Sequence, residues 1–306
     1  MAKRIDSPIT EALDRDGSLT SGPGGVGLSG FVADPILPLT GAVEADPLAT
    51  PGDGVSAGLT FSVNQAQPPV WIGGAVTANA SLTGAQNFAS VGALEGGGHV
   101  VVWTSGFSSG GSGSLFARRF DANGVAVGGD IPVGSVRYTG HTATIGLEDG
   151  GFLVVWQDVN GVQSQRYSAA GVAVGSMVTV GPGGMSSTDG PAITQLESGE
   201  FLVSYSRSGG GFAAWTQRLD ANGALSGAAQ RISEATTTAI EADVAAQADG
   251  GYIAAWAGSA GIFVRSFDAD GTPRTGDVRI VASAQTSSSY QRQPSIAVLE
   301  DGSAVV

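Results

Sequence analysis

Three short turns carry the side chains best suited to bind a metal ion. Each has two oxygen-bearing side chains two residues apart in an Asp-Ala-Asn-Gly or Asp-Ala-Asp-Gly sequence: Asp121 and Asn123, Asp220 and Asn222, and Asp268 and Asp270. Ca²⁺ takes about six to eight oxygen ligands, so two side chains need backbone carbonyls or an adjacent turn to complete a site. Tight turns also favour Asp, Asn and Gly for conformational reasons alone. The sequence leaves both interpretations open, weak calcium sites and purely structural turns.

Side chains that usually perform catalysis are scarce. The chain has no cysteine, and neither of its two histidines, His99 and His141, lies in a recognisable catalytic motif. A Gly-x-Ser-x-Gly elbow, a His-Glu-x-x-His helix, a phosphate loop and sialidase-like Asp boxes are all absent. Paired carboxylates for glycoside hydrolysis could still be assembled from distant segments. We therefore expect a non-enzymatic binding or adhesion module, with a glycoside hydrolase or lyase acting on polysaccharide as the alternative.

These candidate residues belong to an internal repeat. A Gly-rich turn followed by an apolar strand occurs four times and begins a fifth time, and its glycines at 97, 150, 199, 250 and 302 are 53, 49, 51 and 52 residues apart. A second turn ends at a glycine in each full repeat, for example at Gly124 and Gly223. In the second repeat, Ser168 and Ala170 replace the metal-ligating side chains, so not every repeat could bind a cation.

Reading outward from these turns predicts four strands per repeat. In the first repeat they are residues 89–94, 99–104, 115–120 and 125–133, and helical periodicity is absent. Four strands in about fifty residues are typical of a β-propeller blade. The sequence thus predicts an all-β, propeller-like array truncated in its fifth copy at Val306. A row of small β-sandwiches is the less favoured alternative, because fifty residues hold too few strands for it.

Other recurring residues have structural interpretations. An aromatic residue closes the second strand at Trp103, Trp156, Tyr205 and Trp256, and we expect core packing rather than ligand stacking. The arginines Arg119, Arg166 and Arg218 recur in the third strand and are expected to make the same structural hydrogen bonds in each copy. His99 replaces Phe or Tyr at a strand position. Both Asp/Gly turns should lie on one side of each blade, whereas the remaining connections vary, as the residues 105–114 and the tight turns 158–161 and 258–261 illustrate.

Composition limits the partners. Asp and Glu number 27 against 14 Lys and Arg among 306 residues, giving a net charge of -13 that disfavours nucleic acid. The charged residues of the first twenty positions leave no continuous apolar region for a signal peptide, and no apolar segment is long enough to span a membrane. Residues 1–58 are expected to form a flexible Gly/Pro/Asp-rich leader. Residues 59–88 hold either the strands that lead into the first repeat or the outer strand of a preceding blade, and residues 89–306 hold the repeats.

The paired motifs resemble a known family. An Asp-Gly-Gly-Phe-Leu-Val-Val-Trp strand with an Arg-Tyr or Arg-Phe strand and an Asp-Ala-Asn-Gly turn resembles repeats of large bacterial secreted proteins described as RTX-like or hemolysin-type calcium-binding proteins and adhesins. The resemblance covers residues 76–306. It implies type I secretion without an N-terminal signal peptide, a secreted or cell-surface location, carbohydrate or cell-surface protein as partner, and Ca²⁺ as a candidate ligand. The calcium-binding nonapeptide of that family is absent: residues 110–114 begin like one, but no Asp follows.

Overall fold

The computed structural model describes residues 77–80, 84–106, 112–137, 141–182, 190–208, 211–234, 238–282 and 293–306. Every described residue belongs to one compact unit, Ile72–Val306. The predicted leader, residues 1–58, and the apolar segments at 59–63 and 70–72 therefore lie outside the described residues.

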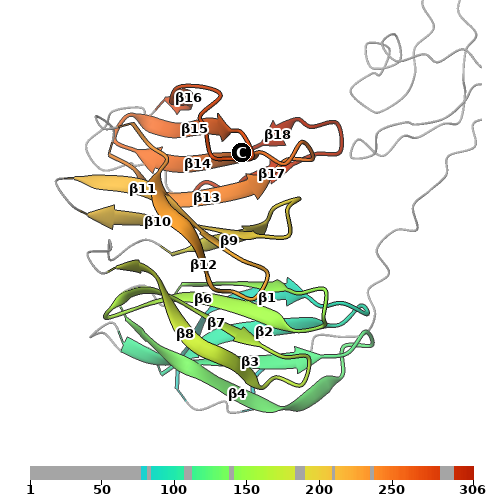
Figure 1. The fold of residues 1–306 in the computed structure, drawn as a ribbon. Helices are drawn as coiled ribbons and strands as arrows, with labels where there is room; N and C mark the ends of the chain where they lie inside the picture. The colour runs from blue at the N-terminus through green and yellow to red at the C-terminus, as the bar shows by residue number, and fades with distance from the viewer. Residues whose placement is uncertain are drawn as a thin grey trace, which may run out of the picture. The chain divides into compact units, whose positions relative to one another are not determined.

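The described residues form four antiparallel sheets of four strands, which we call blades 1 to 4 (Figure 1). Strands follow chain order across each sheet. Blade 1 contains β1 (Gln86–Ala93), β2 (His99–Ser105), β3 (Ser112–Phe120) and β4 (Ala126–Arg137). Blade 2 contains β5 (Thr142–Gly146), β6 (Phe152–Asp158), β7 (Gly161–Tyr167) and β8 (Ala173–Pro182).

Blades 3 and 4 repeat this topology. Blade 3 contains β9 (Ala192–Gln195), β10 (Phe201–Ser208), β11 (Phe212–Leu219) and β12 (Leu225–Arg231). Blade 4 contains β13 (Ile240–Ala246), β14 (Tyr252–Gly258), β15 (Gly261–Phe267) and β16 (Val278–Ala282). The fifth repeat contributes the two-stranded sheet of β17 (Ala297–Val298) and β18 (Ala304–Val305). The predicted propeller-like array of four-stranded blades is confirmed.

The predicted turns form as the sequence indicates. All five glycines of the first turn, including Gly97 and Gly150, have φ between +76° and +88°, and those of the second turn are likewise positive. A left-handed backbone is cheap only for glycine, which is why the glycines mark the period so regularly. Turns 158–161 and 258–261 are two-residue hairpins, as predicted. The loop predicted at 105–114 is shorter, because β2 and β3 extend as far as a Ser105–Ser114 pair.

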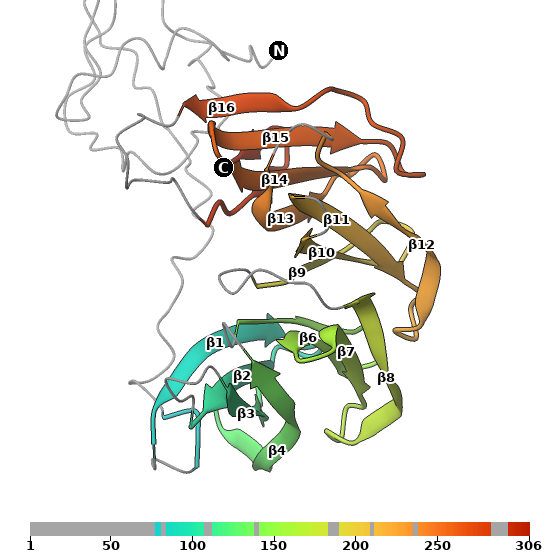
Figure 2. The same cartoon turned by 90° about the vertical axis from the view of Figure 1, so that its left-hand side faces the viewer.

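Apolar cores lie between consecutive blades. One core joins Val100 and Val102 of blade 1 to Val154 and Trp156 of blade 2, a second joins blades 2 and 3, and a third joins blades 3 and 4. Figure 2 shows the sheets side by side. Strand β6 is buried on both faces because it lies between two neighbouring blades. Stacking thus provides the burial that one four-stranded sheet lacks.

The recurring aromatic residues fill these cores, as predicted. Trp156, Tyr205 and Trp256 are at most 1% exposed and belong to the three inter-blade cores, and Trp103 is buried in blade 1. His99 stacks on Phe120 with ring centroids 4.8 Å apart, in the way that Phe152 stacks on Tyr167. It therefore acts as a ring-stacking substitute at a strand position.

The recurring arginines are structural in two of the three blades. Arg166 forms an ion pair with Asp149, and Arg218 with Glu200, in each case with the acid of the neighbouring first turn. Blade 4 has a serine at this position, and Arg274 from the following connection instead pairs with Asp249 at 2.7 Å. Among the described residues, the secondary structure includes no helix long and apolar enough to cross a bilayer.

Candidate binding site at the ends of the innermost strands

The innermost strands of consecutive repeats begin around one cavity of about 490 Å³, which we call the inner-strand cavity. Its walls come from the same part of five repeats: Ser90 of β1, residues 141–144 at β5, residues 190–193 at β9, residues 241–243 of β13 and residues 293–295 ahead of β17. Each strand runs from this cavity toward its first turn, so the cavity and the Asp/Gly turns lie at opposite ends of the blades.

One repeat position contributes a different side chain in each copy. It lies nine residues before the glycine of the first turn and is occupied by Phe88, His141, Gly190, Glu241 and Gln293. Four of the five line the inner-strand cavity. The scaffold is thus repeated, whereas the chemistry at this position changes from apolar to imidazole, carboxylate and amide.

The backbone is strained at this position in three repeats. Phe88, Glu241 and Gln293 have φ of +53°, +54° and +56°, a region that non-glycine residues rarely occupy. In blades 1 and 4 the pairing with the second strand shifts register at this point. Each such residue costs of order 1–3 kcal/mol and tends to occur at functional sites. The repeated strain indicates that the orientation of these side chains is maintained at an energetic cost.

Two carboxylates of β13 lie in the cavity wall. An Oε oxygen of Glu241 accepts a hydrogen bond from the Gln293 amide at 2.6 Å, and Glu241 is only 8% exposed. Asp243 accepts hydrogen bonds from the Val244 amide at 2.9 Å and from the Ile296 amide at 3.0 Å. These bonds hold the beginning of the fifth repeat against blade 4 and fix both carboxylates in place.

Neutral contacts connect the other inner strands. The hydroxyls of Ser90 and Thr142 are 2.9 Å apart, and the rings of Phe88 and His141 have centroids 4.7 Å apart. At Gly190, a Cβ atom would lie 2.5 Å from Cβ of His141, so glycine is the residue that leaves room for the imidazole. Adjacent repeats therefore interlock around the cavity through the very positions that vary.

The wall offers hydrogen-bond acceptors and lacks strong cations. Among the described lining residues, two side chains carry a carboxylate and four carry a hydroxyl group. One amide and one imidazole are also present, but neither Lys nor Arg. Small apolar surfaces such as Ala192 and Ile193 complete it. Such a wall suits a ligand with several hydroxyl or amino groups and disfavours an anion.

The predicted calcium turns are separate from this cavity and from one another. Asp121 accepts hydrogen bonds from the Asn123 amide at 2.9 Å and the Val125 amide at 2.8 Å. Asp220 makes the equivalent bonds with the amides of Asn222 and Ala224.

The third turn is held by different contacts. Asp268 forms an ion pair with Arg274 at 2.6 Å, and Asp270 accepts a hydrogen bond from the Thr272 amide at 2.8 Å. Hydrogen bonds from the amide and the hydroxyl of Thr272 lower the pKa of the Asp270 carboxyl. No cluster of three or more His, Asp or Glu side chains suited to a metal occurs among the described residues. The oxygens thus have conformational roles, and calcium binding stays a prediction.

Glu241 and Asp243 were missed by sequence reasoning. Neither recurs, and an acid within an apolar strand resembles any exposed strand residue. The available signal was the variable position counted back from the repeat glycine, because a position that varies against a regular background indicates where a repeat protein differs in specificity.

Comparison with known proteins extends the fold assignment. No family model matches the sequence, and no curated protein does either. A crystal structure of a protein of unknown function from Dyadobacter fermentans DSM 18053 is similar, with a TM-score of 0.52, 12% identity and coverage of 72% of this chain and 73% of that one. This likeness shows the fold alone.

Two further similar structures have lower scores. An α-L-arabinofuranosidase from Clostridium thermocellum ATCC 27405 gives a TM-score of 0.38 at 12% identity, covering 63% of this chain and 72% of that one. A fucose-specific lectin from Aleuria aurantia gives 0.41 at 12% identity, covering 61% and 58%.

Proposed function

We propose that this propeller is a binding module whose inner-strand cavity holds a small neutral or cationic ligand rich in hydroxyl or amino groups, with a glycan unit as the favoured class. The observation that carries this proposal is the convergence of one variable repeat position from consecutive repeats on a single cavity. Its volume of about 490 Å³ lies within the usual range for small-molecule sites, which is roughly 300–1,000 Å³.

The acceptor-rich wall supports this ligand class. Hydroxyl and amino groups are donors that carboxylates and side-chain hydroxyls can accept, and buried polar groups require such partners. An anionic sugar would instead meet Glu241 and Asp243 without a compensating Lys or Arg among the described lining residues. Neutral and amino sugars are therefore expected to bind more tightly than uronic or sialic acids.

Filling the cavity tests this proposal. Ala192 lines the cavity, and Ala192→Trp would occupy part of its volume without removing a polar side chain. The matched control is Val159→Trp on the β6–β7 turn, where Val159 is 58% exposed. We expect glycan-array and calorimetric binding to fall at least about tenfold, or about 1.4 kcal/mol, in the first variant alone. Equal binding by both variants, or no binding by the parent to any glycan, would reject the assignment.

A polysaccharide-cleaving enzyme is the second candidate, because Glu241 and Asp243 line one cavity and glycoside hydrolysis needs two carboxyl groups. Release of reducing ends from arabinan, xylan and similar polymers should be measured with the parent and with Glu241→Gln and Asp243→Asn. Turnover that either substitution abolishes in a folded protein would favour the enzyme. Binding without turnover would favour the module.

We also propose that the module acts outside the cell, as a secreted or cell-surface protein exported by a type I route. The support is the resemblance of the repeat motifs at residues 76–306 to RTX-like secreted proteins. Export of the protein from its native cells should stop when the type I transporter is inactivated. Unchanged export in that mutant would contradict this part of the proposal.

A further inference from the structure

An Arg and an Asp form the same contact at the outer edge of two blades. In blade 1, Arg118 of β3 lies 3.7 Å from Asp130 of β4, and in blade 4, Arg265 of β15 lies 3.5 Å from Asp277 ahead of β16. Both aspartates come six residues after the glycine of the second turn. We call each pair the Arg–Asp clasp.

Blades 2 and 3 have a different arrangement at this point. Gln165 and Gln217 replace the arginine, and their amide groups donate to carbonyls of their own outer strands, those of Val174 at 3.0 Å and Ser226 at 3.2 Å. The Arg–Asp clasp is therefore not required to brace a blade internally. The clasp also contacts residues outside its own sheet, and these contacts indicate what it holds.

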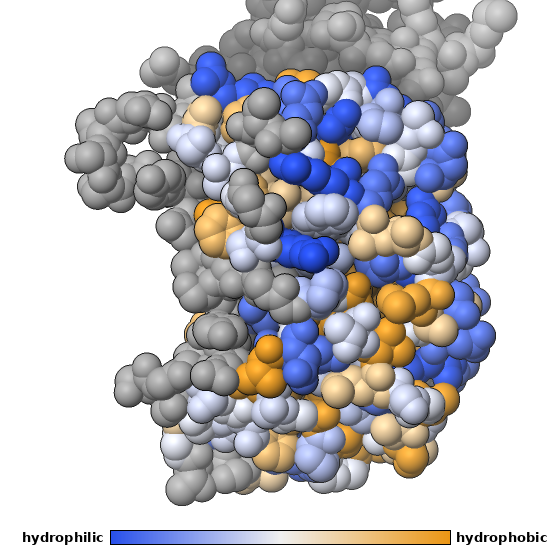
Figure 3. Space-filling model, turned by 60° about the vertical axis from the view of Figure 1, so that its left-hand side comes forward, coloured by the Kyte–Doolittle hydropathy of each residue, from blue (hydrophilic) through white to orange (hydrophobic). Residues whose placement is uncertain are grey.

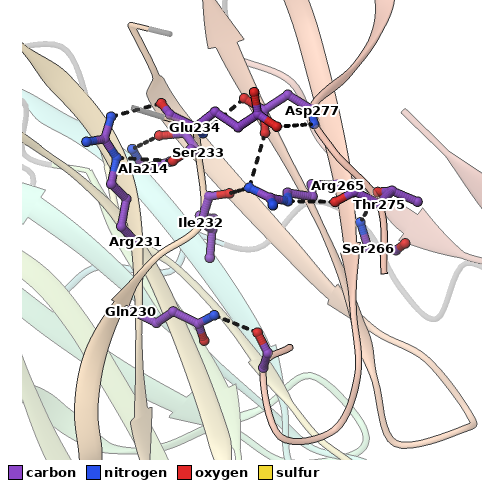
Figure 4. Close-up of polar contacts among 11 residues, drawn as sticks. Ala214, Gln230, Arg231, Ile232, Ser233, Glu234, Arg265, Ser266, Thr275 and Asp277 are labelled. Atoms are coloured by element: carbon purple, nitrogen blue, oxygen red, sulfur yellow. Dashed lines mark hydrogen bonds and ion pairs between the residues drawn. The ribbon is translucent and has the colours of Figure 1, made fainter. Parts of the chain in front are cut away.

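In blade 4 the clasp holds the end of the outer strand of blade 3 (Figure 4). Arg265 donates from Nη1 to the Ile232 carbonyl at 3.2 Å, and Asp277 accepts from the Glu234 amide at 3.0 Å. Ile232 follows directly after β12 and is fully buried. The clasp thus binds a carbonyl and the amide two residues later, where a strand leaves the edge of the neighbouring sheet.

In blade 1 the clasp makes the same two contacts with residues that precede the blade. Arg118 donates from Nη1 to the Ala78 carbonyl at 3.3 Å, and Asp130 accepts from the Ala80 amide at 3.1 Å. The order is again carbonyl first and amide two residues later. Ala78 therefore occupies the place of Ile232, and Ala80 that of Glu234.

The flank of blade 1 on this side has the character of an inter-blade surface. Trp156, Tyr205 and Trp256 each pack toward the blade that precedes their own. Trp103 has the same repeat position and does not belong to the core that blade 1 shares with blade 2, as expected for a ring on the opposite flank. It is 5% exposed and stacks with Phe116 at a centroid distance of 6.1 Å.

We infer that residues 78–80 are the end of the outermost strand of another blade, which flanks blade 1 on the side away from blade 2 and is docked there by the Arg–Asp clasp. Within the predicted segment 59–88, the assignment concerns only the described residues 78–80. The Arg and Asp side chains of the clasp bind peptide groups, so Ala78 and Ala80 can take the places of Ile232 and Glu234 in these two contacts. In blade 4 the Glu234 carboxylate adds a third contact, accepting a hydrogen bond from the Asp277 amide at 3.4 Å. The clasp is an interaction surface for a strand of this same chain.

Matched substitutions in the two clasps test the equivalence. Asp130→Ala and Asp277→Ala should each lower the midpoint of thermal unfolding, by about 2–6 °C, because each leaves one amide and one guanidinium without their carboxylate. Glu148→Ala, which removes an exposed acid of the β5–β6 turn, should leave the midpoint unchanged. A loss in Asp277→Ala with none in Asp130→Ala would overturn the equivalence.

Amide hydrogen exchange on the full chain tests the strand itself. The Ala80 amide should be protected in the parent, exposed in Asp130→Ala, and exposed also when Val70 and Ile72 in the preceding apolar run are both replaced by Asp. Protection that survives the Val70→Asp, Ile72→Asp change would show a local tether of blade 1 and overturn the inference. Protection that disappears on dilution would assign the strand to a second copy, and would overturn it likewise.

Discussion

Close contacts between neighbouring repeats determine which residue fits at a single position. Where the inner strands of blades 1 and 2 approach each other, Gly146 lies so near the Ala93 carbonyl that a Cβ atom would be 1.9 Å from its oxygen. Glycine here permits close packing of two backbones rather than a turn. The residues around the inner-strand cavity are constrained in the same way by their neighbours, as Gly190 is by His141.

Gly146→Ala should therefore destabilise the fold strongly, by about 2–4 kcal/mol, because the added methyl group would meet backbone atoms of Ala93 and Leu94 rather than a side chain that can move aside. Gly129→Ala on β4 is the matched control, because no atom lies within 4 Å of the position its Cβ would take. Urea unfolding of both variants measures the difference. Similar midpoints for the two would contradict the close approach of β1 and β5.

At the scale of the strand and turn, ion pairs connect the first turn to the third strand. Hydrogen bonding by the Ser226 hydroxyl, followed by that of Arg218, lowers the pKa of the Glu200 carboxyl below its usual 4.5. A carboxyl whose pKa is depressed by folding contributes stability above its unfolded pKa and loses it as pH falls through the folded value. Blade 3 should therefore be less stable in acid than at neutral pH.

Glu200→Gln tests this link. The variant should melt below the parent at pH 7, and the gap should be smaller at pH 3, because the stability that the lowered pKa of the Glu200 carboxyl contributes is lost progressively as the pH falls below the usual 4.5. Thermal unfolding followed by circular dichroism at both pH values provides the measurement. A gap of unchanged size at pH 3 would mean that the contribution of Glu200 is not electrostatic.

The second turns are the place to look for calcium. Their Asp oxygens already accept backbone amides, so we expect at most weak binding, without a submicromolar dissociation constant. Calorimetric titration with CaCl₂ should be compared between the parent and the double variant Asp268→Ala, Asp270→Ala. A submicromolar site that the double variant removes would establish a calcium-binding turn after all.

For the whole molecule, the sequence predicted the architecture well and the site poorly. Gly97, Gly150 and their equivalents report a local backbone requirement, so their spacing reveals the blades directly. Glu241 and Asp243 belong to the cavity only because five repeats converge there, which depends on packing between distant segments. The Arg–Asp clasp escaped notice for the same reason, since its partners lie 40 and 50 residues away in the sequence. Figure 3 shows hydrophilic and apolar residues interspersed on the face in view, so hydropathy does not mark a binding site there either.

Because Arg118 and Asp130 bind peptide groups, their two contacts with the strand do not depend on which side chains the anchored residues carry. The same indifference would let a synthetic peptide supplied in trans compete for the clasp of blade 1.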